Sequence, residues 1–163
     1  MPTADSIEPW PLASPEHSGT GGDMLSGAGA RRYGGRWNRP GRRAVYLGGS
    51  LALASMELLV HLKAPAVLET YRKLRVRIPR ALVAAVSECD LPADWAAPRM
   101  HPGTQEMGDR WLRSRASAVL RVPSAVVIGE VNYIANPRHP DFGRIDAGTI
   151  RGFRFDARVL KMP

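Results

Sequence analysis

A guanidinium, a phenol and a carboxylate occur close together in the sequence, at Arg36, Tyr46 and Glu57. An arginine offers a planar fork of donors to an anion, and a carboxylate can stabilise positive charge that develops in a reaction. Gly34 and Gly35 precede the arginine, and glycine lets a backbone adopt positive φ and approach a ligand closely. These residues define one hypothesis, in which Glu57 points into a cleft beside Arg36 and Tyr46.

The same residue types have ordinary structural alternatives, which the sequence leaves open. Glu57 and His61 are four residues apart, so they could form an exposed stripe on a helix, where acidic residues usually lie. Arg36 could be a surface charge, and Tyr46 a core aromatic residue of a strand. Ser124, farther along the chain, could be a turn hydroxyl whose hydrogen bonds are satisfied locally.

Turn and capping residues predict how the stretch around these side chains folds. The Pro-Gly step at residues 40–41 is typical of a turn, and a short strand is expected after it over residues 44–47. Ser50 can cap the helix that follows over residues 51–62, which a proline ends. The predicted unit is a loop, a strand and a helix, with Glu57 in the middle of a mostly apolar helix.

Apolar periodicity predicts further strands and helices. Residues 74–78 alternate between apolar and basic, as in a half-buried strand, and residues 105–117 have helical spacing. A buried strand over residues 119–127 is interrupted at Pro123, which favours a sheet edge or a bulge and would turn the Ser124 hydroxyl out of the regular alternation. This mixture of short strands and a few helices predicts a single mixed α+β domain.

Other segments are expected to be less regular. Residues 1–30 lack clear periodicity and are predicted to be mostly loop, and residues 132–142 contain Asn-Pro and His-Pro steps that also indicate a loop. Residues 81–86 fit one or two helical turns. Alternating apolar residues over 153–159 predict a last strand.

Length and composition are those of one globular domain. The chain has 163 residues, of which 44% are hydrophobic and 23% charged, and such a chain can bury a proper core. Its 23 basic and 15 acidic residues give a formal net charge of +8, a balance that attracts nucleic acid, polyphosphates, nucleotides or an acidic partner protein. Basic residues concentrated over 31–43 and 72–80 indicate an anion-binding face.

The sequence also indicates a cellular compartment. No apolar run reaches the roughly 18 residues that span a bilayer, and residues 1–18 lack the basic start and apolar block of a signal peptide. The single cysteine, Cys89, excludes an internal disulfide and a cysteine-rich zinc site, and we expect it to be a small core residue. We therefore expect a cytoplasmic protein that does not act at a membrane.

Several common catalytic motifs are missing. Ser124 lacks the flanking glycines of a serine-hydrolase elbow. No glycine-rich loop ends in Lys-Ser or Lys-Thr, and Arg32 occupies the third glycine position of the dinucleotide fingerprint. Metal-ligand spacing with Cys, Asp or Glu is absent around the four histidines, which are His17, His61, His101 and His139. The sequence therefore disfavours four interpretations: a serine hydrolase, a nucleoside triphosphatase, a Rossmann dinucleotide-binding fold and a metal site.

The run Gly34-Gly-Arg-Trp-Asn-Arg-Pro-Gly41, followed by Val45-Tyr-Leu47 and the helix that carries Glu57, resembles the RES domain family, named for its arginine, glutamate and serine. Later motifs follow the order of the family. They are Gly108-Asp-Arg-Trp-Leu112, Val122-Pro-Ser-Ala-Val126, Asn132-Tyr-Ile-Ala-Asn-Pro-Arg-His-Pro140 and Phe153-Arg-Phe-Asp-Ala-Arg158. The resemblance covers about residues 27–160, and it divides the chain into a loop-rich N-terminal segment, residues 1–26, and a RES-like NAD-binding catalytic domain, residues 27–163.

The resemblance implies a toxin of a bacterial type II toxin–antitoxin system, with a fold similar to ADP-ribosyltransferases, that is, short and mostly antiparallel strands with a few helices. It implies NAD as the substrate, with no metal, cleaved at the nicotinamide–ribose bond by hydrolysis or phosphorolysis. The implied partner is a cognate antitoxin with a helix-turn-helix DNA-binding part, which blocks the active site. Contact with DNA would then be indirect, through the antitoxin.

Carried onto this chain, the three name residues of the family fall on Arg36, Glu57 and Ser124, with Tyr46 as the aromatic residue of the pocket. Glu57 would stabilise charge on the ribose, and Arg36 would bind the pyrophosphate. Tyr46 would stack on a ring, while Ser124 would hydrogen-bond ribose or the nicotinamide amide. Gly35 is expected to contribute to NAD binding through its backbone.

Two other functions remain as alternatives. The first is an ADP-ribosyltransferase that modifies a cellular protein, which would leave label from NAD on a target. The second is a non-catalytic, basic nucleic-acid-binding module, which predicts steeply salt-dependent binding and no nicotinamide release. The sequence has neither an aromatic-rich basic sheet nor a clear helix-turn-helix, which disfavours the second alternative.

Overall fold

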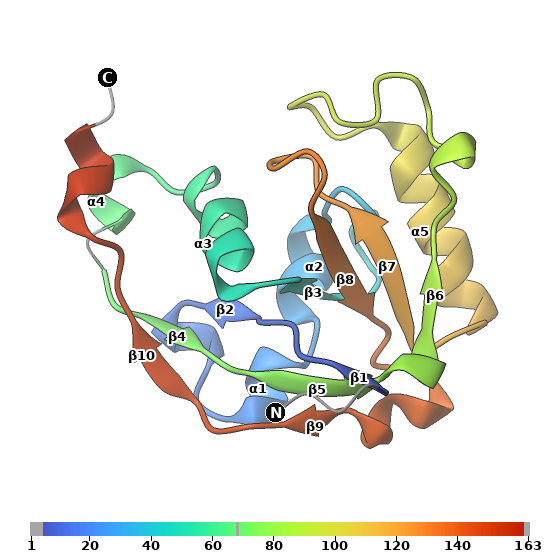
Figure 1. Cartoon of the computed structure of the whole chain (residues 1–163), viewed down its shortest axis with the longest axis horizontal. Coiled ribbons are helices and arrows are strands. Elements are labelled where there is room, and N and C mark those ends of the chain that lie inside the picture. Colours follow the sequence, from blue (N-terminus) through green and yellow to red (C-terminus); the bar gives the residue numbers. More distant parts are fainter. Residues whose placement is uncertain (1–4, 68, 162–163) are drawn as a thin grey trace.

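The computed structural model describes residues 5–67 and 69–161 as one α+β domain with three small sheets (Figure 1). The largest sheet has the strand order β3 (Val45–Gly48), β8 (Val131–Ala135), β7 (Val119–Pro123) and β6 (Val83–Ala85). Its strands pair antiparallel except for β6 and β7, which are parallel. Short, mostly antiparallel strands with a few helices are the arrangement that the sequence predicted.

Two three-stranded antiparallel sheets complete the β structure. One consists of β1 (Ser6–Ile7), β5 (Val76–Pro79) and β9 (Asp146–Ala147), in that order. The other consists of β10 (Arg151–Phe153), β4 (Tyr71–Lys73) and β2 (Leu12–Ala13). Both therefore join the first residues of the chain to its middle and to its end (Figure 1).

The helices are short, apart from α3 and α5. They are α1 (Gly21–Met24), α2 (Ala28–Tyr33), α3 (Leu51–Leu59), α4 (Ala64–Val67) and α5 (Pro102–Ser114). Short 3-10 turns cover Pro15–His17, Arg80–Leu82, Glu88–Asp90, Pro140–Arg144 and Ala157–Lys161. Ser50 caps α3 as predicted, because its hydroxyl accepts a hydrogen bond from the Leu53 amide at 3.1 Å. No helix of the described residues is long and apolar enough to cross a membrane.

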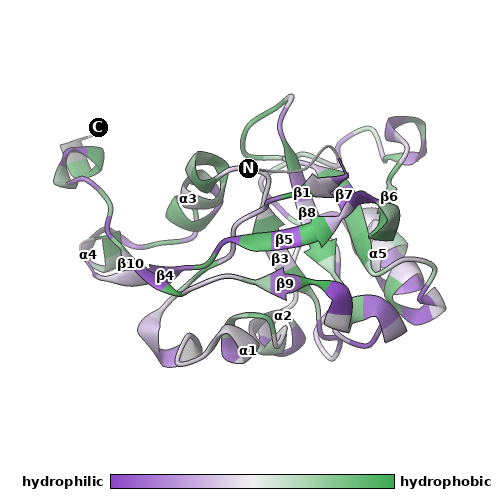
Figure 2. Cartoon of the chain, turned by 60° about the horizontal axis from the view of Figure 1, so that its bottom comes forward, coloured by the Kyte–Doolittle hydropathy of each residue, from purple (hydrophilic) through white to green (hydrophobic). Residues whose placement is uncertain are grey.

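Alternation along the strands gives the four-stranded sheet two different buried faces. On one face, Val45, Leu47 and Val119 pack against the apolar residues of β5. On the other, Leu120, Val122 and Ile134 pack with aromatic residues that include Trp37 and Trp111. Figure 2 shows the apolar colouring concentrated on the strands in the middle of the molecule. Tyr46 packs on the second of these faces.

Two strand and helix predictions are confirmed by burial. Leu74, Val76 and Ile78 are fully buried while Arg75 and Arg77 are exposed, which is the predicted half-buried strand with a basic outer face. Helix α5 overlaps the predicted helix over 105–117 and buries Trp111 and Leu112. In both segments the apolar period alone located the element.

Several local predictions are wrong, for reasons that lie in tertiary pairing. Residues 5–30 are only partly loop, because β1, β2, α1 and part of α2 form there, and residues 132–135 belong to β8 rather than to a loop. Of the helical turns expected over residues 81–86, one forms as the 3-10 turn Arg80–Leu82, whereas residues 83–85 form β6. Pro123 is not on an edge strand: it is the last residue of β7, which lies between β6 and β8. The last strand, β10, ends at Phe153, and Cys89 is exposed.

Strands of two or three residues are too short to show a period, which explains most of these differences. The division of the chain between residues 26 and 27 stays a prediction. The segment before it nevertheless packs into the domain, since Met24 and Leu25 belong to the same apolar cluster as Leu47.

Candidate active site

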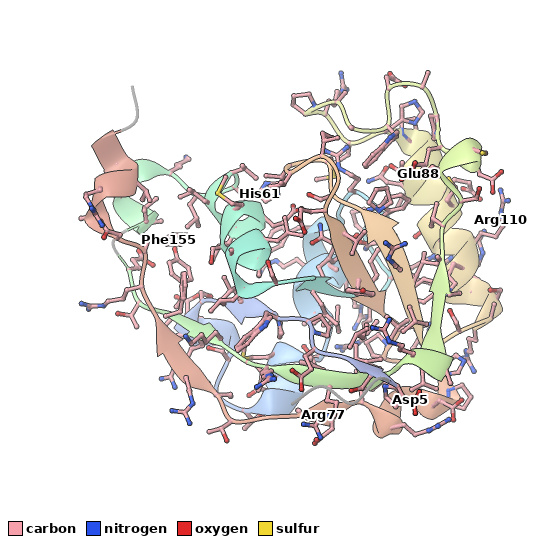
Figure 3. The ribbon with its side chains drawn as sticks, in the orientation of Figure 1. Asp5, His61, Arg77, Glu88, Arg110 and Phe155 are labelled. Carbon is pink, nitrogen blue, oxygen red and sulfur yellow. The ribbon has the colours of Figure 1, made fainter. Side chains whose placement is uncertain are left out.

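The carboxylate of Glu57 lies on the inner side of α3. Leu53 and Ala54, four and three residues earlier, are buried, so Glu57 shares the helical face that packs on the domain and is itself half-buried. His61 lies beyond the end of α3 and is exposed (Figure 3). The alternative of an exposed stripe made by Glu57 and His61 is therefore wrong.

Two side chains from other elements hold this carboxylate. The Ser124 hydroxyl donates to Glu57 Oε1 at 2.7 Å, and the Asn132 amide Nδ2 donates to the same oxygen at 2.5 Å. Ser124 follows β7 and Asn132 is on β8, next to it in the sheet. The second carboxylate oxygen, Oε2, makes no hydrogen bond to the described residues, so it is available to a ligand.

The Ser124 hydroxyl uses all of its hydrogen-bonding positions within the protein. Its hydroxyl accepts hydrogen bonds from the amides of Val126 at 3.1 Å and Val127 at 3.0 Å while it donates to Glu57. A serine hydroxyl has one donor and two acceptor positions, so all three are used, and the residue is buried. A local turn thus fixes the Ser124 hydroxyl, and the hydroxyl in turn holds the carboxylate of Glu57. A role of Ser124 in binding NAD stays a prediction.

Asn132 is a candidate functional residue that the sequence did not single out. Its Oδ1 is buried and has no hydrogen-bond partner, the one such side-chain atom among the described residues. An unpaired buried acceptor typically costs about 1–3 kcal/mol. The Asn132 amide is thus oriented so that Nδ2 donates to Glu57 while Oδ1 is left without a partner. Only the pairing of Asn132 with Gly48 and Val122 in the sheet reveals its position.

The Arg36 side chain is anchored to backbone from a distant segment. Its guanidinium donates to the carbonyl of Trp95 at 2.6 Å and to the carbonyl of Ala97 at 3.0 Å. Burial lowers the pKa of Arg36, and the negative charge of Glu57 offsets part of that effect. Two of the five guanidinium N–H groups are used by these carbonyls, which leaves donors for an anion.

Helix α5 fixes the loop that carries Arg36. The Thr104 hydroxyl donates to the Arg36 carbonyl at 2.8 Å, and the Gln105 amide donates to the Gly35 carbonyl at 3.1 Å. Gly108 allows this approach, because a Cβ there would lie 1.7 Å from the Trp37 carbonyl oxygen. Glycine is a poor helix former, but here it is the residue that lets helix and loop touch.

Tyr46 is half-buried, and its hydroxyl is hydrogen-bonded within the protein. Its hydroxyl donates to Asn38 Oδ1 at 2.6 Å and accepts from the Trp37 amide at 3.0 Å. Burial raises the pKa of Tyr46, so the phenol stays protonated at neutral pH and remains a donor. Gly35 lies against it, since a Cβ on Gly35 would be 2.5 Å from the phenol oxygen. Gly35 therefore lets the loop pack closely on Tyr46, while its contribution to NAD binding stays a prediction.

Replacing Tyr46 by phenylalanine should lower the free energy of unfolding by about 1–3 kcal/mol, because Asn38 Oδ1 and the Trp37 amide would lose their partner in a buried site. Urea denaturation measures the difference. Tyr33→Phe is the matched control, since Tyr33 is 69% exposed and should tolerate the change. Equal losses in the two variants would show that the Tyr46 hydrogen bonds do not stabilise the loop.

A cavity of about 410 Å³ lies beside Ser124, although Arg36, Tyr46 and Glu57 themselves are not among its lining residues. It lies between residues 88–96 and 123–129, and Ser124 and Trp95 both line it. These two residues are the hydrogen-bond partners of Glu57 and Arg36 respectively. Glu88, also at its lining, is visible near the top of the molecule (Figure 3). The cavity size is in the range of small-molecule sites.

The sequence model of the RES domain matches residues 8–156. The chain belongs to the RES domain family. The predicted family is therefore confirmed, and the match extends the RES domain into the N-terminal segment that contains β2. The structure brings together the three residues that the resemblance assigned as the name residues of the family: Ser124 contacts Glu57 directly, and the charge of Glu57 acts on Arg36.

Curated relatives of this RES domain carry toxin names. "Toxin Res" of Photorhabdus laumondii subsp. laumondii is 39% identical over 137 residues, which cover 83% of this chain and 88% of that protein. "Prs ADP-ribosylating toxin" of Sphingobium sp. strain YBL2 is 35% identical over 142 residues, covering 85% of this chain and 88% of that protein. Both matches span most of the RES domain.

A solved structure supports the fold. The RES domain is similar to a chain in the crystal structure of the M. tuberculosis MbcT–MbcA toxin–antitoxin complex, with a TM-score of 0.71 and 19% identity. The similarity covers 96% of this chain and 87% of that chain. The expected mixed α+β fold is thus confirmed by an independent structure. Among the described residues, no group of three or more His, Cys, Asp or Glu side chains is arranged to hold a metal ion.

Proposed function

We propose that this RES domain is the toxin of a bacterial toxin–antitoxin system and that it cleaves the nicotinamide–ribose bond of NAD. The observation that carries the proposal is the anchored carboxylate: Glu57 is held through Oε1 by Ser124 and Asn132, while Oε2 has no partner among the described residues. The similarity to proteins named as toxins supports the biological role.

The chemistry of the bond explains why such a carboxylate is useful. As nicotinamide leaves, positive charge develops on the ribose, as it does on the sugar in glycoside cleavage. A carboxylate already fixed by hydrogen bonds stabilises that charge without reorganising during the reaction. Through Oε2, Glu57 would accept hydrogen bonds from the ribose hydroxyls or lie against the ribose carbon on which positive charge develops. Water or phosphate then completes hydrolysis or phosphorolysis.

The remaining site residues have separate proposed roles. Arg36 would direct its free N–H groups to the pyrophosphate of NAD, since its other donors already fix it on the carbonyls of Trp95 and Ala97. Tyr46 and Gly35 would form the wall against a ring of the dinucleotide. Ser124 would contribute chiefly by positioning Glu57, because its hydroxyl has no free hydrogen-bond position.

The proposed partner is a cognate antitoxin with a helix-turn-helix part that covers the active site, which would leave any DNA contact to the antitoxin. The similarity to a chain crystallised within a toxin–antitoxin complex supports such a partner. NAD is the proposed substrate, without a metal, and the proposed compartment is the cytoplasm, where NAD is plentiful.

A second reaction is favoured by one observation: a relative is named for ADP-ribosylation. The same site would then transfer ADP-ribose to a protein side chain instead of to water or phosphate.

Mass spectrometry of products formed from NAD, with and without phosphate and with cell extract, distinguishes the acceptors. We expect nicotinamide in every reaction, with ADP-ribose or its phosphate as the co-product. Label found only on a protein would favour the transferase, and intact NAD throughout would reject both.

Asn132→Leu should separate the catalytic role of Asn132 from its structural role. The change removes the donor to Glu57, and hydrogen bonds to charged groups are typically worth about 1.5–3 kcal/mol, so NAD cleavage should slow roughly tenfold or more. It also removes the unpaired Oδ1, which offsets part of the lost hydrogen bond. The free energy of unfolding should therefore fall by less than the transition-state stabilisation that is lost. Steady-state kinetics and urea denaturation give the two readouts. Unchanged kinetics would remove Asn132 from the site.

A further inference from the structure

A second hollow, of about 200 Å³, lies at the other end of the four-stranded sheet and is lined mainly by arginines. Five of its eight lining residues are Arg42, Arg43, Arg113, Arg115 and Arg138. They come from three segments: the loop before β3, the C-terminal end of α5 and the loop after β8. No acidic residue is among the lining residues. We call this feature the arginine hollow.

The positive charge of the arginine hollow is only partly neutralised. Arg42 lies 3.6 Å from Asp109, and Arg113 lies 3.4 Å from Glu106. Arg43 donates to a backbone carbonyl, that of Ser26, which leaves its charge unbalanced. Arg115 and Arg138 have no ion-pair partner among the described residues, and both are exposed. Three guanidinium charges therefore converge on one concave surface without a carboxylate partner.

Arg115 occupies a backbone position that normally belongs to glycine. It ends α5 with φ 50° and ψ 35°, and it is the one non-glycine residue with positive φ in the described chain. Glycine is the usual residue at such a helix end because a Cβ is unfavourable there. Strained positions of this kind concentrate at functional sites. An arginine kept there in spite of the strain, at the edge of an arginine-lined hollow, indicates a role for its side chain.

Sheet register separates this hollow from the Glu57 site. Asn132, which contacts Glu57, pairs with Gly48 at the end of β3, whereas Val45 at the start of β3 pairs with Ala135. Asn136 comes directly after Ala135 and Arg138 two residues later, and residues 41–43 precede β3. From residue 132 to residue 136 a strand advances about 13 Å. The arginine hollow and the carboxylate are thus at opposite ends of the same strands.

We propose that the arginine hollow binds the phosphate groups of a small phosphorylated ligand, at a site separate from the one proposed for NAD cleavage. Planar guanidinium groups bind phosphate oxygens through paired hydrogen bonds, and three unbalanced charges suit a di- or triphosphate. A concave hollow of this volume accommodates such a group better than it accommodates a flat macromolecular surface. The ligand would bring negative charge to Arg43, Arg115 and Arg138 together.

Inorganic pyrophosphate is the probe, and isothermal titration calorimetry at low ionic strength measures its binding to the full chain. Arg115→Gly should lower the affinity about tenfold or more, because a charge-assisted contact is lost. The variant should also be at least as stable as the parent, since glycine relieves the positive φ. Arg138→Gln should lower the affinity in the same way. Arg110→Gln is the matched control, because Arg110 is exposed on α5, points away from the domain and does not line the hollow (Figure 3).

The outcomes separate this proposal from the proposed enzymatic function. Weaker binding in Arg115→Gly and Arg138→Gln, with parental binding in Arg110→Gln and parental NAD cleavage in all three, supports a distinct phosphate site. The proposal is overturned if the parent does not bind pyrophosphate or if all three variants weaken binding equally, which would indicate general charge attraction. It is also overturned if Arg36→Lys weakens binding as much as Arg115→Gly does, which would place the phosphate at the Glu57 site.

Discussion

Replacing Glu57 by glutamine should slow NAD cleavage by about two to three orders of magnitude, the loss typical of removing one preorganised electrostatic group from an active site. The amide keeps the size of the side chain, and its oxygen can still accept from Ser124 and Asn132. What is lost is the negative charge opposite the developing positive charge on the ribose. Initial rates of nicotinamide release from NAD measure the effect.

A matched variant shows whether the effect belongs to this carboxylate. Glu130 is exposed in the loop after Ser124, so Glu130→Gln makes the same chemical change close by in the chain without touching Glu57. It should keep parental activity. If Glu57→Gln cleaved NAD as fast as Glu130→Gln does, the carboxylate would have no role in the reaction.

Replacing Gly108 by alanine should lower the free energy of unfolding by about 3 kcal/mol, at the upper end of typical overpacking costs. The new Cβ would lie 1.7 Å from the Trp37 carbonyl oxygen, so α5 and the loop of residues 35–38 must move apart. The gain in helix propensity, at most about 1 kcal/mol, is too small to compensate. Activity should fall as well, because Arg36 belongs to the displaced loop and small misplacements of catalytic groups are costly.

Gly29→Ala is the control for this prediction. Gly29 is also within a helix, α2, but a Cβ there would meet no atom within 4 Å. Its replacement should raise the free energy of unfolding by up to about 1 kcal/mol through helix propensity alone. Urea denaturation of both variants gives the comparison. Stabilisation by both substitutions would mean that α5 and the Trp37 loop are not in close contact.

The sequence contained enough local information to place part of the site. The Ser50 cap and the apolar spacing located the start of α3, which ends at Leu59 and carries Glu57 in its last turn, and the alternation around Val76 located β5. Capping and apolar periodicity depend only on residues close together in the sequence, so they can be recognised without knowing the tertiary structure. The resemblance to the RES domain family then linked Arg36, Glu57 and Ser124 across the chain.

The remaining parts of the site depend on contacts between distant residues. Asn132 was expected in a loop because of the Asn-Pro and His-Pro steps nearby, whereas pairing with β3 and β7 makes it a strand residue next to Glu57. The carbonyls that anchor Arg36 belong to Trp95 and Ala97, in a segment without periodicity. Gly108 is unfavourable in a helix by its own propensity, and only its contact with Trp37 explains its place in α5. Local sequence patterns do not indicate such contacts between residues that are distant in the sequence.

The most direct test of the Glu57 site is a crystal structure of the Glu57→Gln variant with intact NAD bound. We expect the nicotinamide ribose within hydrogen-bond distance of residue 57, with Ser124 and Asn132 still holding its side chain and the pyrophosphate on the free N–H groups of Arg36. NAD bound away from residue 57, for example with its pyrophosphate in the arginine hollow and its ribose far from α3, would contradict the proposed active site.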